Sequence, residues 1–286
     1  MKFSLSTNWC NRRMVSGEEI ADKAMELGFE ELELGFHTTQ EQVKGFKARL
    51  GQISVGSVHA FCPVPLSAPQ GYPELYLLAS LDDDARAIAR VHVRKNIEFA
   101  AEMGADALVL HAGRVMCRGF FSRWDMKRRV KRGRKLIEAF RRELDQTVPI
   151  LEKNKVTLGL ENLPYLEGFP AEWEMQDLVG DWVKPWFDTG HDFVRRVSQW
   201  DVLSPTSGQE SASPLSASPL MQPIGMHIGD SQGGDDHLPP GEGRVDFAAL
   251  KAMAENARHV VFEPAANVSE ADLRKGIEHL RKTWAL

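Results

Sequence analysis

Short aliphatic or β-branched runs alternate with longer helical patterns along this chain of 286 residues. Each run has the length of one strand, and each intervening stretch is long enough to return the chain to the same edge of a sheet. This alternation is typical of βαβ units and a parallel sheet. Strands are predicted near residues 3–6, 30–34, 53–59, 107–111, 156–161, 186–188, 225–228 and 260–263.

Eight strands is the number found in a closed (β/α)8 barrel. Helical patterns separate most of the predicted strands, and the first begins after the typical N-cap residue Ser16. The stretch 124–153 predicts one extended helix, in which Pro149 is expected to introduce a break. An open doubly wound sheet is the alternative, but no Gly-x-Gly-x-x-Gly follows the first strand. We therefore predict an α/β fold, a single (β/α)8 TIM barrel.

The chain has a suitable length for one barrel domain over residues 1–286. Residues 203–223 are rich in Ser and Pro, so we expect a flexible insertion there without a chemical role. No apolar run approaches the roughly 20 residues of a membrane span, and no signal peptide is evident. The three cysteines lack metal-type spacing, which favours a reducing cytoplasm as the location.

The formal net charge of −5 hides a basic segment. Residues 114–142 contain twelve Lys or Arg and only two acids. A solvated helix face is the first interpretation of such a run. The second is a local attraction for phosphate, on a nucleic acid or on a phosphosugar.

The last six predicted strands all end in, or lead directly to, a His, Asp or Glu. In a barrel these strand ends converge on one ring, where an unpaired buried carboxylate is costly and neighbouring acids repel each other. A divalent cation would neutralise them, and mixed carboxylate and imidazole donors suit zinc, manganese, cobalt or iron better than calcium. The candidate ligands are His59, His111, Glu161, Asp188, His191, His227, Asp235, His237 and Glu263.

Four short motifs resemble the xylose-isomerase-like barrel superfamily, which includes sugar epimerases, inosose dehydratases and nucleases of the endonuclease IV type. The motifs are Leu160-Glu161-Asn162, Asp188-Thr189-Gly190-His191, His227-Ile228-Gly229-Asp230 and Pro240-Gly241-Glu242-Gly243. The resemblance covers nearly the whole chain apart from the insertion.

The resemblance implies that Glu161, Asp188, His227 and Glu263 ligate one divalent Zn, Mn, Co or Mg ion. It also implies that the two glutamates exchange protons with a sugar carbon, while His191 orients the substrate oxygens. The first function predicted is therefore a metal-dependent isomerase or epimerase of a sugar or phosphosugar.

The endonuclease branch of the same superfamily uses nine ligands and three zinc ions, and all nine candidates stand at matching places here. The second prediction is thus a zinc phosphodiesterase acting on abasic DNA, with nucleic acid as partner. Two departures count against it: Gly190 replaces a usual Cys, and Asp236 replaces a usual Arg. A barrel that binds a metabolite without turnover is a third alternative. His37, His92, His259 and His279 receive no predicted role.

Overall fold

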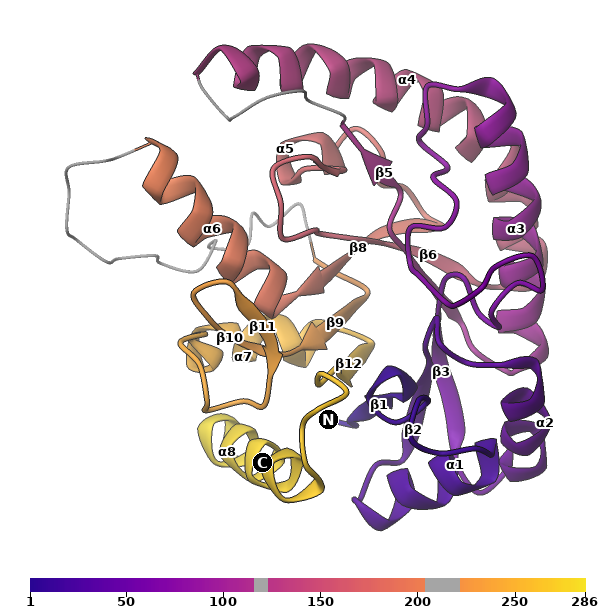
Figure 1. The fold of residues 1–286 in the computed structure, drawn as a ribbon, viewed down its shortest axis with the longest axis vertical. Helices are drawn as coiled ribbons and strands as arrows, with labels where there is room; N and C mark the ends of the chain where they lie inside the picture. The colour runs from indigo at the N-terminus through magenta and orange to yellow at the C-terminus, as the bar shows by residue number, and fades with distance from the viewer. Residues whose placement is uncertain (116–122, 204–221) are drawn as a thin grey trace.

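The computed structural model describes residues 1–115, 123–203 and 222–286. In this part of the chain eight parallel strands close into a barrel in the order β1-β12-β9-β8-β6-β4-β3-β2 (Figure 1). The barrel closes where the first strand pairs with the last. The strands are β1 (Ser4–Ser6), β2 (Glu31–Leu34), β3 (Ser54–His59), β4 (Ala107–Leu110), β6 (Thr157–Glu161), β8 (Val183–Asp188), β9 (Gly225–Ile228) and β12 (His259–Phe262).

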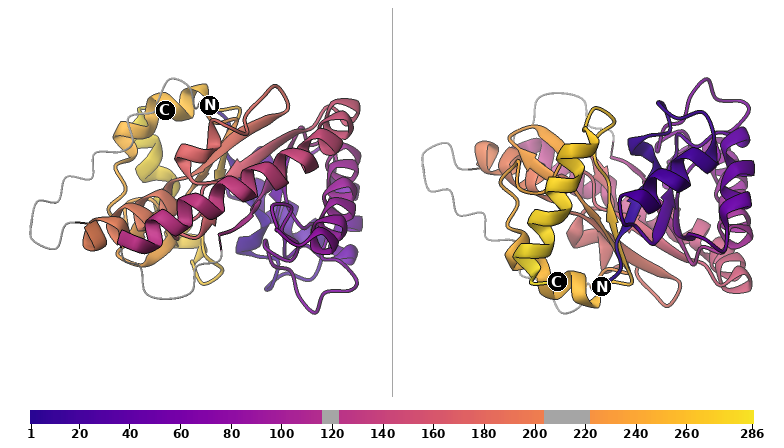
Figure 2. Two further views of the ribbon diagram at one scale, coloured as in Figure 1. Left: turned by 90° about the horizontal axis from the view of Figure 1, so that it is seen from above. Right: turned by 90° about the horizontal axis from the view of Figure 1, so that it is seen from below.

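Helices surround this barrel, as the three views in Figures 1 and 2 show. The helices are α1 (Gly17–Glu26), α2 (Gln40–Arg49), α3 (Asp83–Glu102), α4 (Arg123–Asn154), α5 (Glu172–Met175), α6 (Thr189–Leu203), α7 (Phe247–Asn256) and α8 (Glu270–Trp284). The predicted (β/α)8 barrel is therefore confirmed. Within the described ranges, no helix is long and apolar enough to cross a membrane.

Two predictions about local structure had different outcomes. Ser16 caps α1 as expected: its hydroxyl accepts from the Glu19 backbone N–H, and the Glu19 side chain caps Ser16 in return. The expected break at Pro149 is wrong, because α4 continues through it. Packing of α4 against α3 and β6 outweighs the loss of one helical hydrogen bond. Residues 204–221 of the predicted insertion lie outside the described part of the chain.

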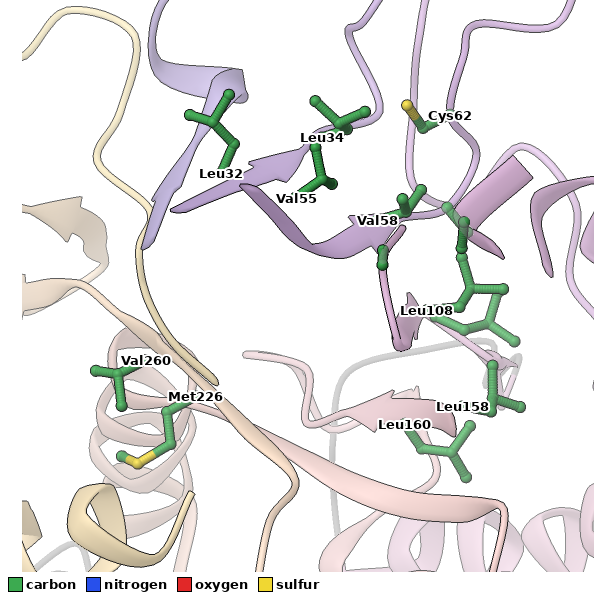
Figure 3. Close-up of a cluster of buried hydrophobic side chains, with 14 of the residues drawn as sticks. Leu32, Leu34, Val55, Val58, Cys62, Leu108, Leu158, Leu160, Met226 and Val260 are labelled. Carbon is green, nitrogen blue, oxygen red and sulfur yellow. The ribbon is translucent and has the colours of Figure 1, made fainter. Parts of the chain in front are cut away.

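The strands place apolar side chains outward, against the helices. Figure 3 shows labelled residues of β2, β3, β4, β6, β9 and β12 pointing away from the centre of the barrel. In β3 the alternation shifts at Gly56, where the pairing register with β2 skips a residue. This irregularity lets Val55 and Val58 both face outward, while Ser57 and His59 face the interior.

One large side chain fills the middle of the barrel interior. The Trp186 side chain packs in a small cluster with Ala107, Val109, Ile224 and Val261. Room for its ring comes from two glycines on the neighbouring strands: a Cβ at Gly159 would lie 2.8 Å from the ring, and one at Gly225 would lie 2.3 Å from it. Trp186 thus separates the carboxyl ends of the strands from the opposite end of the barrel.

Two short antiparallel sheets follow the carboxyl ends of the strands. One pairs β10 (Asp230–Gln232) with β11 (Asp235–Leu238), and the other pairs β5 (Gly113–Arg114) with β7 (Gly168–Phe169). Both belong to loops that leave the end of the barrel where the predicted ligands lie.

Candidate metal centre

Four predicted ligands from separate strands meet above Trp186. Ligand atoms of Glu161, Asp188, His227 and Glu263 all lie within 4.8 Å of one another, and all four residues are buried. His227 Nδ1 is 3.1 Å from Glu263 Oε2, 3.2 Å from Glu161 Oε1 and 3.8 Å from Asp188 Oδ2. Strands β6, β8, β9 and β12 end at the same rim, which brings these side chains together.

Glu161 lies at the centre of the cluster. Its Oε2 is 3.0 Å from His59 Nε2 and 3.1 Å from His111 Nε2. Its Oε1 is 3.2 Å from Nδ1 of both His227 and His191. His59, His111 and Glu161 therefore form a second group of metal-type donors that shares Glu161 with the first.

A third group of donors lies beside the first two. It consists of His191, Asp236 and His237, with Nε2 of each histidine 3.7 Å from the Asp236 carboxylate. The side chain of the predicted ligand Asp235 lies outside the described part of the structure. Asp236, which sequence reasoning regarded only as a departure from the nuclease pattern, is the acid placed in this group.

The two departures noted in the sequence are neighbours in space. A Cβ built at Gly190 would lie 3.3 Å from Cβ of Asp236 and 3.5 Å from Oδ1 of Asp188. A larger residue at position 190 would therefore crowd both carboxylates. Glycine at 190 leaves room for an acid at 236.

Backbone carbonyls fix the orientation of three histidine rings. The Nδ1–H group donates at 3.0 Å in each case: His59 to Ala60 O, His191 to Asn162 O and His237 to Glu263 O. A carbonyl only accepts, so one proton stays on Nδ1, and Nε2 of the neutral ring carries a lone pair. Because Nε2 faces carboxylate oxygens, either a second proton or a metal ion is needed between them. The donor set therefore fits a divalent metal.

Glu33 is a buried site residue that the sequence analysis missed. Both of its oxygens lie 3.1 Å from His227 Nε2, and Ser57 Oγ donates to Oε2 at 2.8 Å. An outer carboxylate on a ligating imidazole fixes the ring and increases its basicity as a ligand. Glu33 lies inside β2 rather than at a strand end, but its charge within a predicted buried strand was a signal that could have identified it.

Glu74 provides a similar outer partner for His111. It comes from the long connection between β3 and α3, and its nearer oxygen is 3.6 Å from His111 Nδ1. Arg114 and the Tyr165 hydroxyl donate to the same carboxylate, which is 6% exposed. No periodic pattern in this connection pointed to Glu74, because its position depends on contacts between distant segments.

The electric field of the centre favours positive charge. Burial would raise the pKa of Glu161, but His227 and His111 outweigh it and hold that pKa well below its usual range. Burial would lower the pKa of His191, but Asp188 and Glu161 raise it to about 10. Burial would also lower the pKa of His227, but Glu263, Glu33 and Glu161 raise it well above its usual value. A bound metal ion would satisfy this field in place of protons.

Other motif residues hold the strand ends in place. The Asn162 amide exchanges hydrogen bonds with the backbone of Asp188 at 2.7 and 3.0 Å, which joins the ends of β6 and β8. Asp230 accepts from the backbone N–H groups of Ser231, Gly241, Gly243 and Val245. Asp230 therefore shapes the loop after β9.

A pocket of about 450 Å³ opens onto the centre. Glu161, Glu263 and several of the histidines line one side, and the 70–73 segment of the β3–α3 connection lines another. His37, which received no predicted role, also lines this pocket. This volume is in the range that accommodates a small molecule.

The basic segment 114–142 does not line the pocket in its described part. Arg129 is fully buried and pairs with Glu174 at 2.6 Å, and Arg141 contacts Asp177. The structure thus gives these two cations structural partners and offers no support for phosphate binding by this segment within the pocket.

A closed (β/α)8 barrel with clustered acids and imidazoles at the carboxyl ends of its strands defines the class of this protein. The chain belongs to the xylose isomerase-like TIM barrel family, whose model matches residues 21–283. The search of curated proteins found no match.

Solved structures share this fold over nearly the whole chain. A D-tagatose 3-epimerase-like protein is 21% identical, with a TM-score of 0.67 and coverage of 100% of this chain and 97% of its own. A 3-keto-D-glucoside 4-epimerase from E. coli is 14% identical, with a TM-score of 0.65 and 99% coverage of both chains. The IolI protein with a bound zinc atom is 13% identical, with a TM-score of 0.68 and complete coverage of both.

Proposed function

We propose that the protein is a metal-dependent isomerase or epimerase of a sugar or sugar derivative. The observation that carries the proposal is the pocket of about 450 Å³, which both Glu161 and Glu263 line beside the donor group they form with Asp188 and His227. The names of similar structures, among them a 3-keto-D-glucoside 4-epimerase, support this class of reaction. The zinc atom in the IolI protein supports a metal at such a centre.

Glu161, Asp188, His227 and Glu263 would hold one divalent ion. When bound, such an ion supplies Lewis acidity, which polarises a carbonyl and acidifies the neighbouring C–H bond. Glu161 and Glu263 would move the proton, one removing it and the other returning it on the opposite face.

Glu263 has the freer carboxylate of the pair. Its Oε1 accepts one hydrogen bond, at 3.1 Å from Asn8, and its Oε2 lies 3.1 Å from His227 Nδ1, whereas Glu161 has four imidazole nitrogens within 3.2 Å. We therefore assign proton removal to Glu263. His191 also lines the pocket, where it would orient substrate oxygens.

Turnover of ketoses by the purified, metal-loaded protein tests the proposal. Glu263→Gln keeps the shape of the side chain and removes the base, so turnover should fall at least about 100-fold while the fold is retained. Gln222→Glu is the control, because it exchanges Gln and Glu at a position before the start of β9 that does not line the pocket. Full activity of Glu263→Gln would refute the proton-transfer scheme, and binding of sugars without turnover would favour the binding-only barrel.

The overlapping and adjoining donor groups favour a second candidate, a multinuclear zinc phosphoesterase. Glu161 belongs to two of the groups, and His191, Asp236 and His237 supply a third. Clustered zinc ions stabilise the attacking and leaving oxygens of a phosphoester. The 70–73 segment that lines the pocket favours a small substrate over a DNA duplex.

Elemental analysis and activity assays separate the two candidates. One ion per chain with ketose turnover supports the isomerase, whereas three ions with cleavage of abasic-site DNA supports the hydrolase. Asp236→Asn should change the metal count only if the third group binds an ion.

A further inference from the structure

Arg12 lines the pocket from a loop that supplies none of the residues of the donor groups. It lies in the loop after β1, whereas the donor groups follow β3, β4, β6, β8, β9 and β12. Among the described residues that line the pocket, Arg12 is the one Lys or Arg. The negative charges of the lining belong to Glu161 and Glu263, which the proposed metal would bind.

The Arg12 guanidinium has a neutral partner rather than an acid. Its Nη2 donates to His37 Nε2 at 3.2 Å, and within the described ranges no carboxylate forms an ion pair with it. Burial and the positive charge of Arg12 lower the pKa of His37 to about 4, so this imidazole is neutral near pH 7. A guanidinium has five N–H donors, and this contact accounts for one of them.

The neighbouring Arg13 shows what a structural arginine looks like in the same loop. Its guanidinium donates to Trp9 O at 2.9 Å and to Val268 O at 3.4 Å, and it lies 4.6 Å from the centroid of the Trp9 ring. Arg13 therefore connects loops of the barrel. Arg12 instead faces a cavity with its positive charge uncompensated by any described acid.

The arrangement gives the pocket two chemically different ends. We propose that Arg12 binds an anionic group of the substrate, a phosphate or carboxylate, at the end away from the reacting carbon. This inference rests on the proposed function and narrows its substrate class to acidic sugars. A guanidinium suits both groups because its parallel N–H donors match two oxygens of either one.

Three sugars that differ only at carbon 6 test the proposal: D-fructose, D-fructuronate and D-fructose 6-phosphate. Calorimetry with the manganese-loaded protein measures the affinity of each. At least one anionic sugar should bind roughly 10- to 100-fold more tightly than D-fructose, since charge-assisted hydrogen bonds are strong. Comparison of the two anionic sugars distinguishes carboxylate from phosphate.

Substitution at Arg12 shows whether that residue is responsible. Arg12→Gln should remove the advantage of the anionic sugar and leave D-fructose affinity within about two-fold, while Arg12→Lys should restore part of it. Arg94→Gln is the matched control, because it removes one exposed positive charge on α3, paired with Glu98.

Two results would overturn the inference. These are similar affinities for all three sugars, including a failure of all three to bind, and an anionic preference that persists in Arg12→Gln. The proposed function is judged separately by turnover. If anionic sugars bind more tightly through Arg12 but no sugar is turned over, the anion subsite is supported and the isomerase function is refuted. If only neutral sugars are turned over, the isomerase function is supported and the anion subsite is refuted.

Discussion

The two ends of the barrel interior use the same residue types for different purposes. At the amino end of the strands, His259 Nε2 lies 2.7 Å from Asp106 and its Nδ1 lies 3.5 Å from Glu31. Each acid has a further donor: Arg258 contacts Asp106 at 2.9 Å, and Ser4 donates to Glu31 at 2.7 Å. At this end each acid therefore has a second donor besides His259.

The carboxyl end also has acids and imidazoles, but Asp188 Oδ2 and His111 Nδ1 are buried there without a hydrogen-bond partner in the described part of the chain. Glu161 faces four imidazole nitrogens, and the rings of His59, His191 and His237 already donate Nδ1–H to carbonyls. Among the described residues, Glu161, Asp188 and Glu263 form ion pairs with histidines and with no Lys or Arg. The positions of the protons, more than the composition, therefore distinguish a cluster that fits a metal ion from a network of ion pairs.

Removal of metal is the strongest test of the difference between the two ends of the barrel. Turnover should fall below detection after chelation and return with zinc or manganese. Ion concentrations about 1,000-fold above Kd contribute about 4 kcal/mol, so the melting temperature should rise by roughly 8–15 °C. Differential scanning calorimetry measures the rise. The metal-induced rise in melting temperature should largely vanish in Glu161→Gln and persist in His259→Gln. An equal reduction of this rise in both variants would contradict the difference between the two ends of the barrel.

Glu33→Gln tests the outer partner of His227. The amide retains a hydrogen bond to the ring but loses the negative charge, so metal affinity should fall roughly 10- to 100-fold. Competition with a fluorescent chelator measures this affinity without relying on turnover. Ser57→Ala, which removes only the donor to Glu33, should have a smaller effect. Unchanged affinity in Glu33→Gln would show that the charge plays no part.

The amino end should respond to pH instead of metal. Burial would lower the pKa of His259, but Asp106 and Glu31 raise it to about 9. Because the folded pKa lies above the unfolded value of about 6.5, this stabilisation is complete below pH 6.5 and is lost as pH rises through 9.

The loss should be about 1–3 kcal/mol, reduced by the half-exposed position of Asp106. Urea unfolding of the wild type and His259→Gln at pH 6 and pH 9.5 measures it. The difference in stability between the two proteins should shrink at the higher pH, and a constant difference would refute the assignment.

The smallest effect is expected from Glu74→Gln. At 3.6 Å from His111, and held by Arg114 and Tyr165, Glu74 orients the ring less directly than Glu33 orients His227. Metal affinity should fall about three-fold or less, because His111 is not among the four residues proposed to hold the ion and contacts them through Glu161. A loss of metal affinity as large as that of Glu33→Gln would show that Glu74 affects the ion as strongly as Glu33 does.

Local sequence patterns were sufficient for most of the fold. Strand β9 has the bounds that were predicted, and β6 differs from its predicted range by one residue. β8 begins earlier than predicted, at Val183, and α4 continues through Pro149. The start of β8 and the continuity of α4 both depend on packing against neighbouring elements. A local sequence pattern does not contain that information.

The sequence by itself determined the eight strands of the barrel and which acids and imidazoles stand at their ends. It could do so because strand alternation and chain order are local properties, and because parallel strands end at a common rim. The tertiary structure alone decided that Glu33 and Glu74 contact the histidines, that Asp236 fits beside Gly190, and that Arg12 faces the pocket. These contacts join segments far apart in the chain, and their distances follow from the closure of the barrel and the packing of its loops.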